Sequence, residues 1–262
     1  MNTKPLALVA LLLPALMLLS PPITWADSQP AATLSQDTSF AEVSSLAQQG
    51  NAEAQDRLGA MYYLGQGVAK DYKQATYWFQ KAAAQGNAKA QSNLGIAYVD
   101  GRGVPQDYRQ AAYWYQKAAE QGNAIAQTNL GTRYANGQGV AQDYRQAMYW
   151  YQKAAAQGNA DAQFNIGTMY QHAQGVALDY KQAFYWFQKS AAQGNAVGEA
   201  AMGWMYDNGY GVAQDKTQAA YWYSKAAAQG NAIAQGNLEV LYGTPDSGGG
   251  STYVRPVHNH RR

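Results

Sequence analysis

Apolar and small side chains recur in this chain at helical spacing, inside a block that returns every 36 residues. In the copy that begins at residue 86, Ala90, Leu94, Gly95 and Tyr98 lie on one face of a 3.6-residue helix. A glycine-rich turn follows, and a second apolar pattern through residues 111–118 predicts a second helix. A fixed period of tens of residues is typical of proteins built from stacked repeats. The pattern therefore predicts an all-α chain of helix pairs.

Five complete units and two partial ones account for most of the chain. A segment with helical spacing precedes the first unit. We interpret it as half a repeat that caps the stack, because the terminal units of a solenoid need an atypical outer face. One more first-type helix follows the last unit. The full units span 51–86, 87–122, 123–158, 159–194 and 195–230, and the half-repeats span 39–50 and 231–243.

Three columns recur in all five units and are predicted to hold the stack together. The glycine column lies inside the first helix, where glycine costs about 1 kcal/mol of helix propensity relative to alanine, so it needs a packing reason. The tryptophan column is predicted to be core, since each ring can bury roughly 150–250 Å². The aspartate column is predicted to cap the second helices through their backbone N–H groups. The columns are Gly59, Gly95, Gly131, Gly167 and Gly203; Trp78, Trp114, Trp150, Trp186 and Trp222; and Asp71, Asp107, Asp143, Asp179 and Asp215.

Each unit also repeats a set of short motifs. In the second unit these are Leu94-Gly95-x-x-Tyr98, Gly101-x-Gly103-Val104, Asp107-Tyr108-x-x-Ala111 and Tyr113-Trp114-Tyr115-x-Lys117-Ala118-Ala119. With these motifs the chain resembles the Sel1-like repeat family, the longer-looped relatives of tetratricopeptide repeats. The resemblance covers about residues 39–243 and implies a right-handed α-solenoid of stacked antiparallel helix pairs. It indicates little about function, because one fold hosts many functions.

Other columns of the first helices differ from unit to unit, and the resemblance implies that these helices line a concave surface. We expect this surface to bind a protein or an extended peptide. Asparagine amides both donate and accept hydrogen bonds, which suits a peptide backbone, while Arg, Met and Trp are enriched at interfaces. The alternative is that the asparagines only join neighbouring helices and that the variable residues are solvent positions. The predicted contacts are Asn93, Asn129, Arg133, Asn165, Met169, Trp204 and Met205.

The two ends of the chain depart from the repeat. Residues 1–26 are predicted to be a secretory signal peptide, in which Lys4 precedes the apolar run 6–19 and Thr24-Trp25-Ala26 offers a cleavage site. The run is short for a permanent membrane span, and an uncleaved anchor is the alternative. The absence of cysteine is compatible with a periplasmic or secreted protein stabilised by its repeats. The remaining end segments are a flexible leader, 27–38, and a Gly-rich basic tail, 244–262.

Neither charge nor motifs point to chemistry. The chain has 19 basic and 17 acidic residues and no clustered basic face for nucleic acid. The Gly65-Gln66-Gly67 turn lacks the third glycine and the strand of a dinucleotide site. No Ser-x-x-Lys or Gly-x-Ser-x-Gly nucleophile motif occurs. His172 is a lone turn residue, and the two histidines of His258-x-His260 are too few for a metal site. We therefore expect no cofactor and no catalytic residue.

The sequence favours a secreted or periplasmic repeat scaffold that binds a protein or peptide and performs no chemistry. Such a scaffold would act as an adaptor or regulator of an envelope complex, and docking onto a cell-wall enzyme is one form of this role. The alternative is an envelope enzyme or ligand binder that acts on β-lactams or on peptidoglycan. A saturable β-lactam hydrolysis or muropeptide cleavage by the pure protein would favour that alternative.

Overall fold

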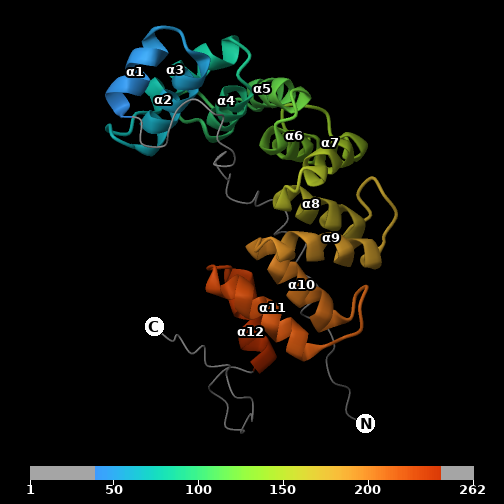
Figure 1. The fold of residues 1–262 in the computed structure, drawn as a ribbon. Coiled ribbons are helices and arrows are strands. Elements are labelled where there is room, and N and C mark those ends of the chain that lie inside the picture. The colour runs from blue at the N-terminus through green and yellow to red at the C-terminus, as the bar shows by residue number, and fades with distance from the viewer. Residues whose placement is uncertain (1–38, 243–262) are drawn as a thin grey trace, which may run out of the picture. The chain divides into compact units, whose positions relative to one another are not determined.

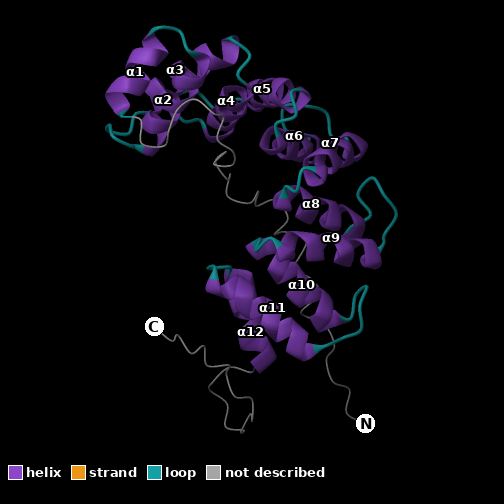
Figure 2. Cartoon of the chain, viewed as in Figure 1, coloured by secondary structure: helices purple, strands orange, loops and turns teal. Residues whose placement is uncertain are grey.

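The computed structural model describes residues 39–242 (Figure 1), and within that range the chain forms helices joined by loops, with no strand (Figure 2). The predicted signal peptide (1–26), leader (27–38) and tail (244–262) lie outside the described residues. The helices are α1 (Phe40–Gln48), α2 (Ala52–Leu64), α3 (Tyr72–Ala84), α4 (Ala88–Asp100), α5 (Tyr108–Glu120), α6 (Ala124–Asn136), α7 (Tyr144–Ala156), α8 (Ala160–Gln171), α9 (Tyr180–Ala192), α10 (Ala196–Asn208), α11 (Lys216–Ala228) and α12 (Ala232–Tyr242).

The described part of the chain divides into two compact units. The boundary lies between Ala154 and Ala155, so unit 1 holds the described residues up to 154 and unit 2 those from 155. In unit 1, consecutive helices from α1 to α6 pack on one another, and the first helices α4 and α6 also touch directly. In unit 2, consecutive helices from α8 to α12 do the same, and α10 contacts both α8 and α12. The fold is the predicted all-α solenoid of helix pairs.

Side-chain caps fix where each helix begins. The predicted aspartate caps are confirmed: Asp107, for example, accepts hydrogen bonds from the backbone N–H groups of Arg109 and Gln110 at 2.8 and 3.1 Å. The first helices have an equivalent cap that the sequence analysis did not assign. There an asparagine side chain accepts from the N–H three residues later, at 2.8–2.9 Å in the five full units. These asparagines are Asn51, Asn87, Asn123, Asn159 and Asn195.

Residues in the left-handed backbone conformation follow the first helices. Gly65, Gly101, Gly137 and Gly209 take positive φ at this position, as the sequence pattern predicts. The fourth unit departs from the pattern, because Ala173 occupies the glycine position and still adopts a φ of +55°. Since a Cβ atom disfavours the left-handed region, Ala173 is a strained position.

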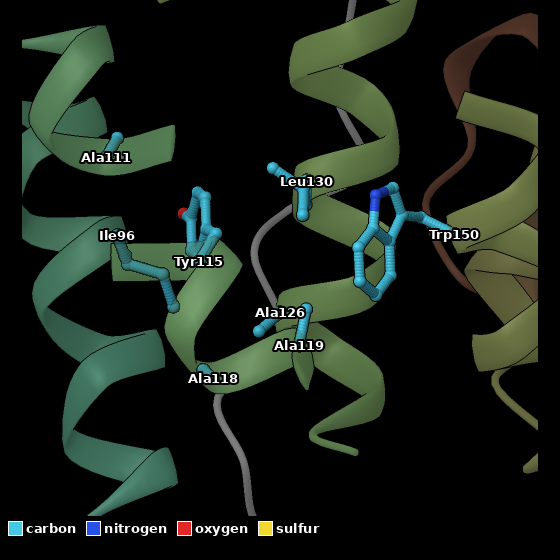
Figure 3. Close-up of a cluster of buried hydrophobic side chains, with 8 residues drawn as sticks. All are labelled: Ile96, Ala111, Tyr115, Ala118, Ala119, Ala126, Leu130 and Trp150. Carbon is cyan, nitrogen blue, oxygen red and sulfur yellow. The ribbon is translucent and has the colours of Figure 1, made fainter. Parts of the chain in front are cut away.

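The glycine column has the packing role that its recurrence predicts. Each glycine of this column lies under an aromatic ring of its partner helix, and a Cβ atom built on Gly95 would lie 2.5 Å from the Tyr115 ring. In unit 1, Tyr115 is buried in a cluster that joins α4, α5, α6 and α7 (Figure 3). The glycine is therefore the space into which the ring fits. The rings are Phe79, Tyr115, Tyr151, Phe187 and Tyr223, opposite Gly59, Gly95, Gly131, Gly167 and Gly203.

The tryptophan column is only partly the core that the sequence predicts. Trp78 and Trp150 are 9% and 5% exposed, but Trp114, Trp186 and Trp222 are half-buried. The residue after each tryptophan is buried more deeply, because one helical step of about 100° turns it toward the glycine of the partner helix. The tryptophans pack instead toward the preceding pair, as Trp78 does in the cluster with residues of α1 and α2.

Candidate protein-binding face

The variable positions of the first helices form the candidate face, in two separate groups. Asn93 lies on α4 and Asn129 and Arg133 lie on α6, all in unit 1. The other predicted contacts lie in unit 2, on α8 and α10. Direct contact between α4 and α6, and between α8 and α10, brings side chains of successive repeats together within each group.

Asn93 is engaged within the protein, which supports the alternative interpretation for this asparagine. Its side chain is 5% exposed, and its Nδ2 donates a 2.9 Å hydrogen bond to Oδ1 of Asp56 on α2. Burial raises the pKa of Asp56 to about 6, while the hydrogen bond from Asn93 and the charge of Lys89 oppose the rise. Asn93 therefore joins two repeats and is not available as a contact.

Asn129 differs from Asn93, although it occupies the same column. The position that supplies Asp56 in the first unit is Ser92 in the second. The Nδ2 of Asn129 is buried without a hydrogen-bond partner, and so is the Oγ of Ser92. Buried polar atoms are normally paired, so these two groups are candidates for binding, among several buried polar atoms of the described residues that have no hydrogen-bond partner. The third asparagine, Asn165 on α8, is half-buried.

Met169 and Met205 are core residues, contrary to the prediction that they are surface contacts. They are 2% and 0% exposed, and Met205 belongs to the cluster that contains Phe187 and Met202. Their column is one residue beyond the column of Trp204. One residue along a helix is a rotation of about 100°, which turns the methionine column from the outer face of the first helix toward the second helices.

Arg133 occupies this same inward column and is also buried, with 5% of its surface exposed. Its guanidinium lies 5.4 Å from the centre of the Tyr108 ring on α5. Burial lowers the pKa of Arg133, and the nearby hydroxyls of Tyr115, Tyr108 and Tyr151 act in the opposite direction. Arginine nonetheless stays protonated at neutral pH.

Trp204 on α10 is half-buried and forms part of an aromatic stack in unit 2. Its ring centre lies 4.9 Å from that of Tyr210, and Tyr210 stacks on Tyr180 at 4.5 Å with an interplanar angle of 21°. Tyr210 is 37% exposed. The stack thus presents aromatic surface at a position where the other units carry Ala60, Ile96, Thr132 and Thr168.

Glu199 is an unusual residue that the sequence analysis missed. It is fully buried in a column that elsewhere carries glutamine, whose Nε2 donates to a backbone carbonyl eight residues earlier. Glu199 accepts a 2.8 Å hydrogen bond from Gln229, as the glutamines at 55, 91 and 163 do from the glutamine thirty residues later, but it donates none and instead pairs with Lys225 at 2.9 Å. One acidic residue in a glutamine column was the available signal. Its partners close the site, so Glu199 is a structural ion pair.

The described residues show little sign of catalytic or membrane-spanning elements. Between residues 39 and 242, His, Asp and Glu side chains form no group of three that could hold a metal ion. His172 follows the end of α8, and burial lowers its pKa. In the same range, none of the helices has the length and apolarity needed to cross a membrane.

These features define a tandem-repeat α-solenoid that presents the faces of its first helices. The Sel1 repeat model matches the chain five times in tandem, so the chain belongs to the Sel1 repeat family. Proteins of this family typically act as protein-interaction scaffolds. The matched repeats begin at the residue after each asparagine cap and span 52–87, 88–123, 124–159, 160–195 and 196–231.

Solved structures include clear relatives. A protective antigen of uropathogenic Escherichia coli strains is 40% identical, with a TM-score of 0.69 over 78% of this chain, and the match covers 44% of that antigen. A Sel1 repeat protein of Oxalobacter formigenes is 36% identical, with a TM-score of 0.71 over 74% of this chain and 78% of its own. The immunity protein Pa5087 of Pseudomonas aeruginosa, 21% identical with a TM-score of 0.51, shares the fold. No curated protein matches the sequence.

Proposed function

We propose that this protein is an exported, non-catalytic scaffold that binds a protein partner through the faces of its first helices. In this role it serves as an adaptor or regulator of an envelope complex. The observation that carries the proposal is the aromatic stack of Trp204, Tyr210 and Tyr180 in unit 2. Half-exposed tryptophan and tyrosine side chains held in fixed positions are the side chains that dominate protein interfaces.

The stack also has no counterpart in the other repeats of the described range, 39–242. Tyr210 occupies a turn position that carries Gln66, Arg102, Gln138 or Gln174 in the other units, and Trp204 occupies a column of smaller residues. Columns that recur serve the stacking of repeats, whereas this pair occurs once. A single aromatic patch suits recognition of one partner better than it suits the fold.

Export rests on the signal peptide predicted at residues 1–26, and the absence of cysteine is compatible with it. The similarity to a protective antigen supports it, since an antigen that protects has to meet the immune system. The predicted signal peptide and this similarity support the proposal of a periplasmic or secreted location. The predicted cell-wall partner would be reached from the same compartment.

The test is affinity capture from envelope extract of the host with the full chain as bait. Two matched variants use residues that the protein itself places at these positions: Trp204→Thr, as in Thr132 and Thr168, and Tyr210→Gln, as in Gln66 and Gln138. Circular dichroism verifies that both remain helical. We expect the native chain to retain a partner protein and each variant to lose it.

Retention of the same partner by both variants would contradict the role of the stack. Capture of nothing by the native chain, together with saturable β-lactam hydrolysis or muropeptide cleavage, would replace the scaffold with an envelope enzyme. The assays use the same protein preparation, so the two functions are compared directly.

A further inference from the structure

Arg133 is a buried cation without an acidic partner. The other members of its column are Met61, Ala97, Met169 and Met205, all apolar or small. Among the described residues, no carboxylate forms an ion pair with Arg133, and its Nε has no hydrogen-bond partner. Burying an unpaired charge is costly, and methionine at this position is buried in three other repeats. Packing alone therefore does not account for arginine.

The preceding repeat shows what a completed version of this arrangement contains. There Arg102 lies over the rings of Tyr63 and Tyr72, as Arg133 lies over Tyr108. Arg102 also has an acid: its Nε lies 3.6 Å from Oδ2 of Asp100, and one Nη donates to the Tyr63 hydroxyl at 2.7 Å. The charge of Arg102 is satisfied within the protein.

The next repeat keeps the aromatic ring and supplies a cation from another column, Arg133, but it replaces the two groups that pair with Arg102. The position of Asp100 is Asn136, and the position of Tyr63 is Val99. The residue in the place of Arg102 is Gln138, whose Oε1 is buried and unpaired. Tyrosine hydroxyls lie near Arg133, but its Nε makes no hydrogen bond and no carboxylate of the described residues pairs with it.

A second unpaired donor lies one helical turn away on the same helix. Asn129 precedes Arg133 by four residues, which puts both on one side of α6, about 6 Å apart along the axis. Its Nδ2 is buried without an acceptor. Backbone carbonyls two residues apart on an extended peptide are separated by roughly 6–7 Å. The Arg133 guanidinium and the Asn129 amide are therefore spaced to bind an anionic group and a neutral backbone carbonyl of one extended peptide.

We propose that Arg133 and Asn129 bind a carboxylate-bearing segment of a protein partner, with the carboxylate at Arg133 and a backbone carbonyl at Asn129. The carboxylate comes from an acidic side chain or from a free C-terminus. Carboxylate is the anion whose planar geometry a guanidinium matches, and the small exposed fraction of Arg133 restricts the ligand to a compact group. This inference rests on the proposed function, because it names the chemistry of the partner.

The test uses an array of short peptides of random sequence probed with the full chain. The peptides are printed in four matched sets that combine two changes. The C-terminus is either free or amidated, and the acidic positions carry either Asp and Glu or the neutral Asn and Gln. We expect binding to depend on a carboxylate in one of the two locations, and the sets show which. Removing that carboxylate should weaken binding by roughly tenfold or more.

Arg133→Met is the decisive variant, because it installs the residue found at Met169 and Met205. It should keep the fold and lose carboxylate-dependent binding by a similar factor, while Arg133→Lys should retain part of it. Arg102→Gln is the matched control: it removes a cation that is already paired and installs the residue of Gln66 and Gln138. Its binding should equal that of the native chain.

The inference would be overturned if Arg133→Met bound the peptides as well as the native chain does. It would also be overturned if binding did not depend on a carboxylate, or if the native chain bound no peptide. If Arg133→Met proves unstable, the Nε–Hε signal of Arg133 in the native protein provides a second readout. A shift on adding a retained peptide supports the site, and an unmoved signal overturns it. Capture of a partner through Trp204 would still stand in either case, because that stack lies in unit 2.

Discussion

Glycine-to-alanine substitutions should have opposite effects on stability at Gly95, which lies under an aromatic ring, and at Gly236, which does not. In Gly95→Ala, the new Cβ atom would lie 2.5 Å from Cε1 and 2.6 Å from Cδ1 of Tyr115, whereas ordinary contact begins at 3.4 Å. The ring has to retreat by about 0.9 Å, and it is 1% exposed inside the cluster of Figure 3. Overpacking of this kind costs about 1–3 kcal/mol, and the gain in helix propensity returns about 1 kcal/mol. We expect a net loss of up to about 2 kcal/mol.

Gly236→Ala is the control for helix propensity alone. Gly236 lies within α12, is exposed, and a Cβ atom built on it would meet nothing within 4 Å. The same change should therefore leave the stability unchanged or raise it by up to about 1 kcal/mol. Urea unfolding followed by circular dichroism gives both midpoints, with the native chain measured alongside.

A double-mutant cycle then assigns the loss to the ring. In the background of Tyr115→Leu, which shortens the side chain opposite the glycine, Gly95→Ala should cost less than it does in the native chain. The reasoning would be refuted if Gly95→Ala were as stable as the native protein, or if its cost were the same in both backgrounds. The recurrence of glycine would then need a cause other than the fit of the ring.

Two further predictions concern backbone strain and pH. Ala173→Gly should raise the stability by up to about 1 kcal/mol, because glycine adopts the φ of +55° without a steric cost, and a lower urea midpoint would contradict this. For Asp56, the folded pKa of about 6 lies above the ordinary value of 3.8, so the native state holds a proton that the unfolded state releases. The contribution of Asp56 to stability is therefore greatest near pH 4 and declines as the pH rises through 6. Asp56→Asn removes this dependence. The difference in melting temperature, variant minus native chain, should therefore rise between pH 4 and pH 7. A difference that stays constant with pH would contradict the pKa assigned to Asp56.

The sequence determined the helices and where they start and stop. Helical periodicity, the cap at Asp107 and the glycine turn at Gly101 act over a few residues, so their effect can be read from the local chain. The 36-residue period then fixed the number of units, since every unit has to bury the same face against its neighbours. The family follows from the same recurrence.

The tertiary structure decided which side chains within those helices are buried and which are available. Adjacent columns differ by one step of about 100°, so the periodicity alone did not separate Trp114 from Tyr115, or Trp204 from Met205. Partners were equally undetermined. Asn93 donates to Asp56 in the preceding repeat, whereas the equivalent position for Asn129 is Ser92, and only the structure shows that these two columns meet. Recurrence in sequence records the interactions that every repeat needs, whereas an unpaired buried group such as Arg133 becomes visible only when its surroundings are known.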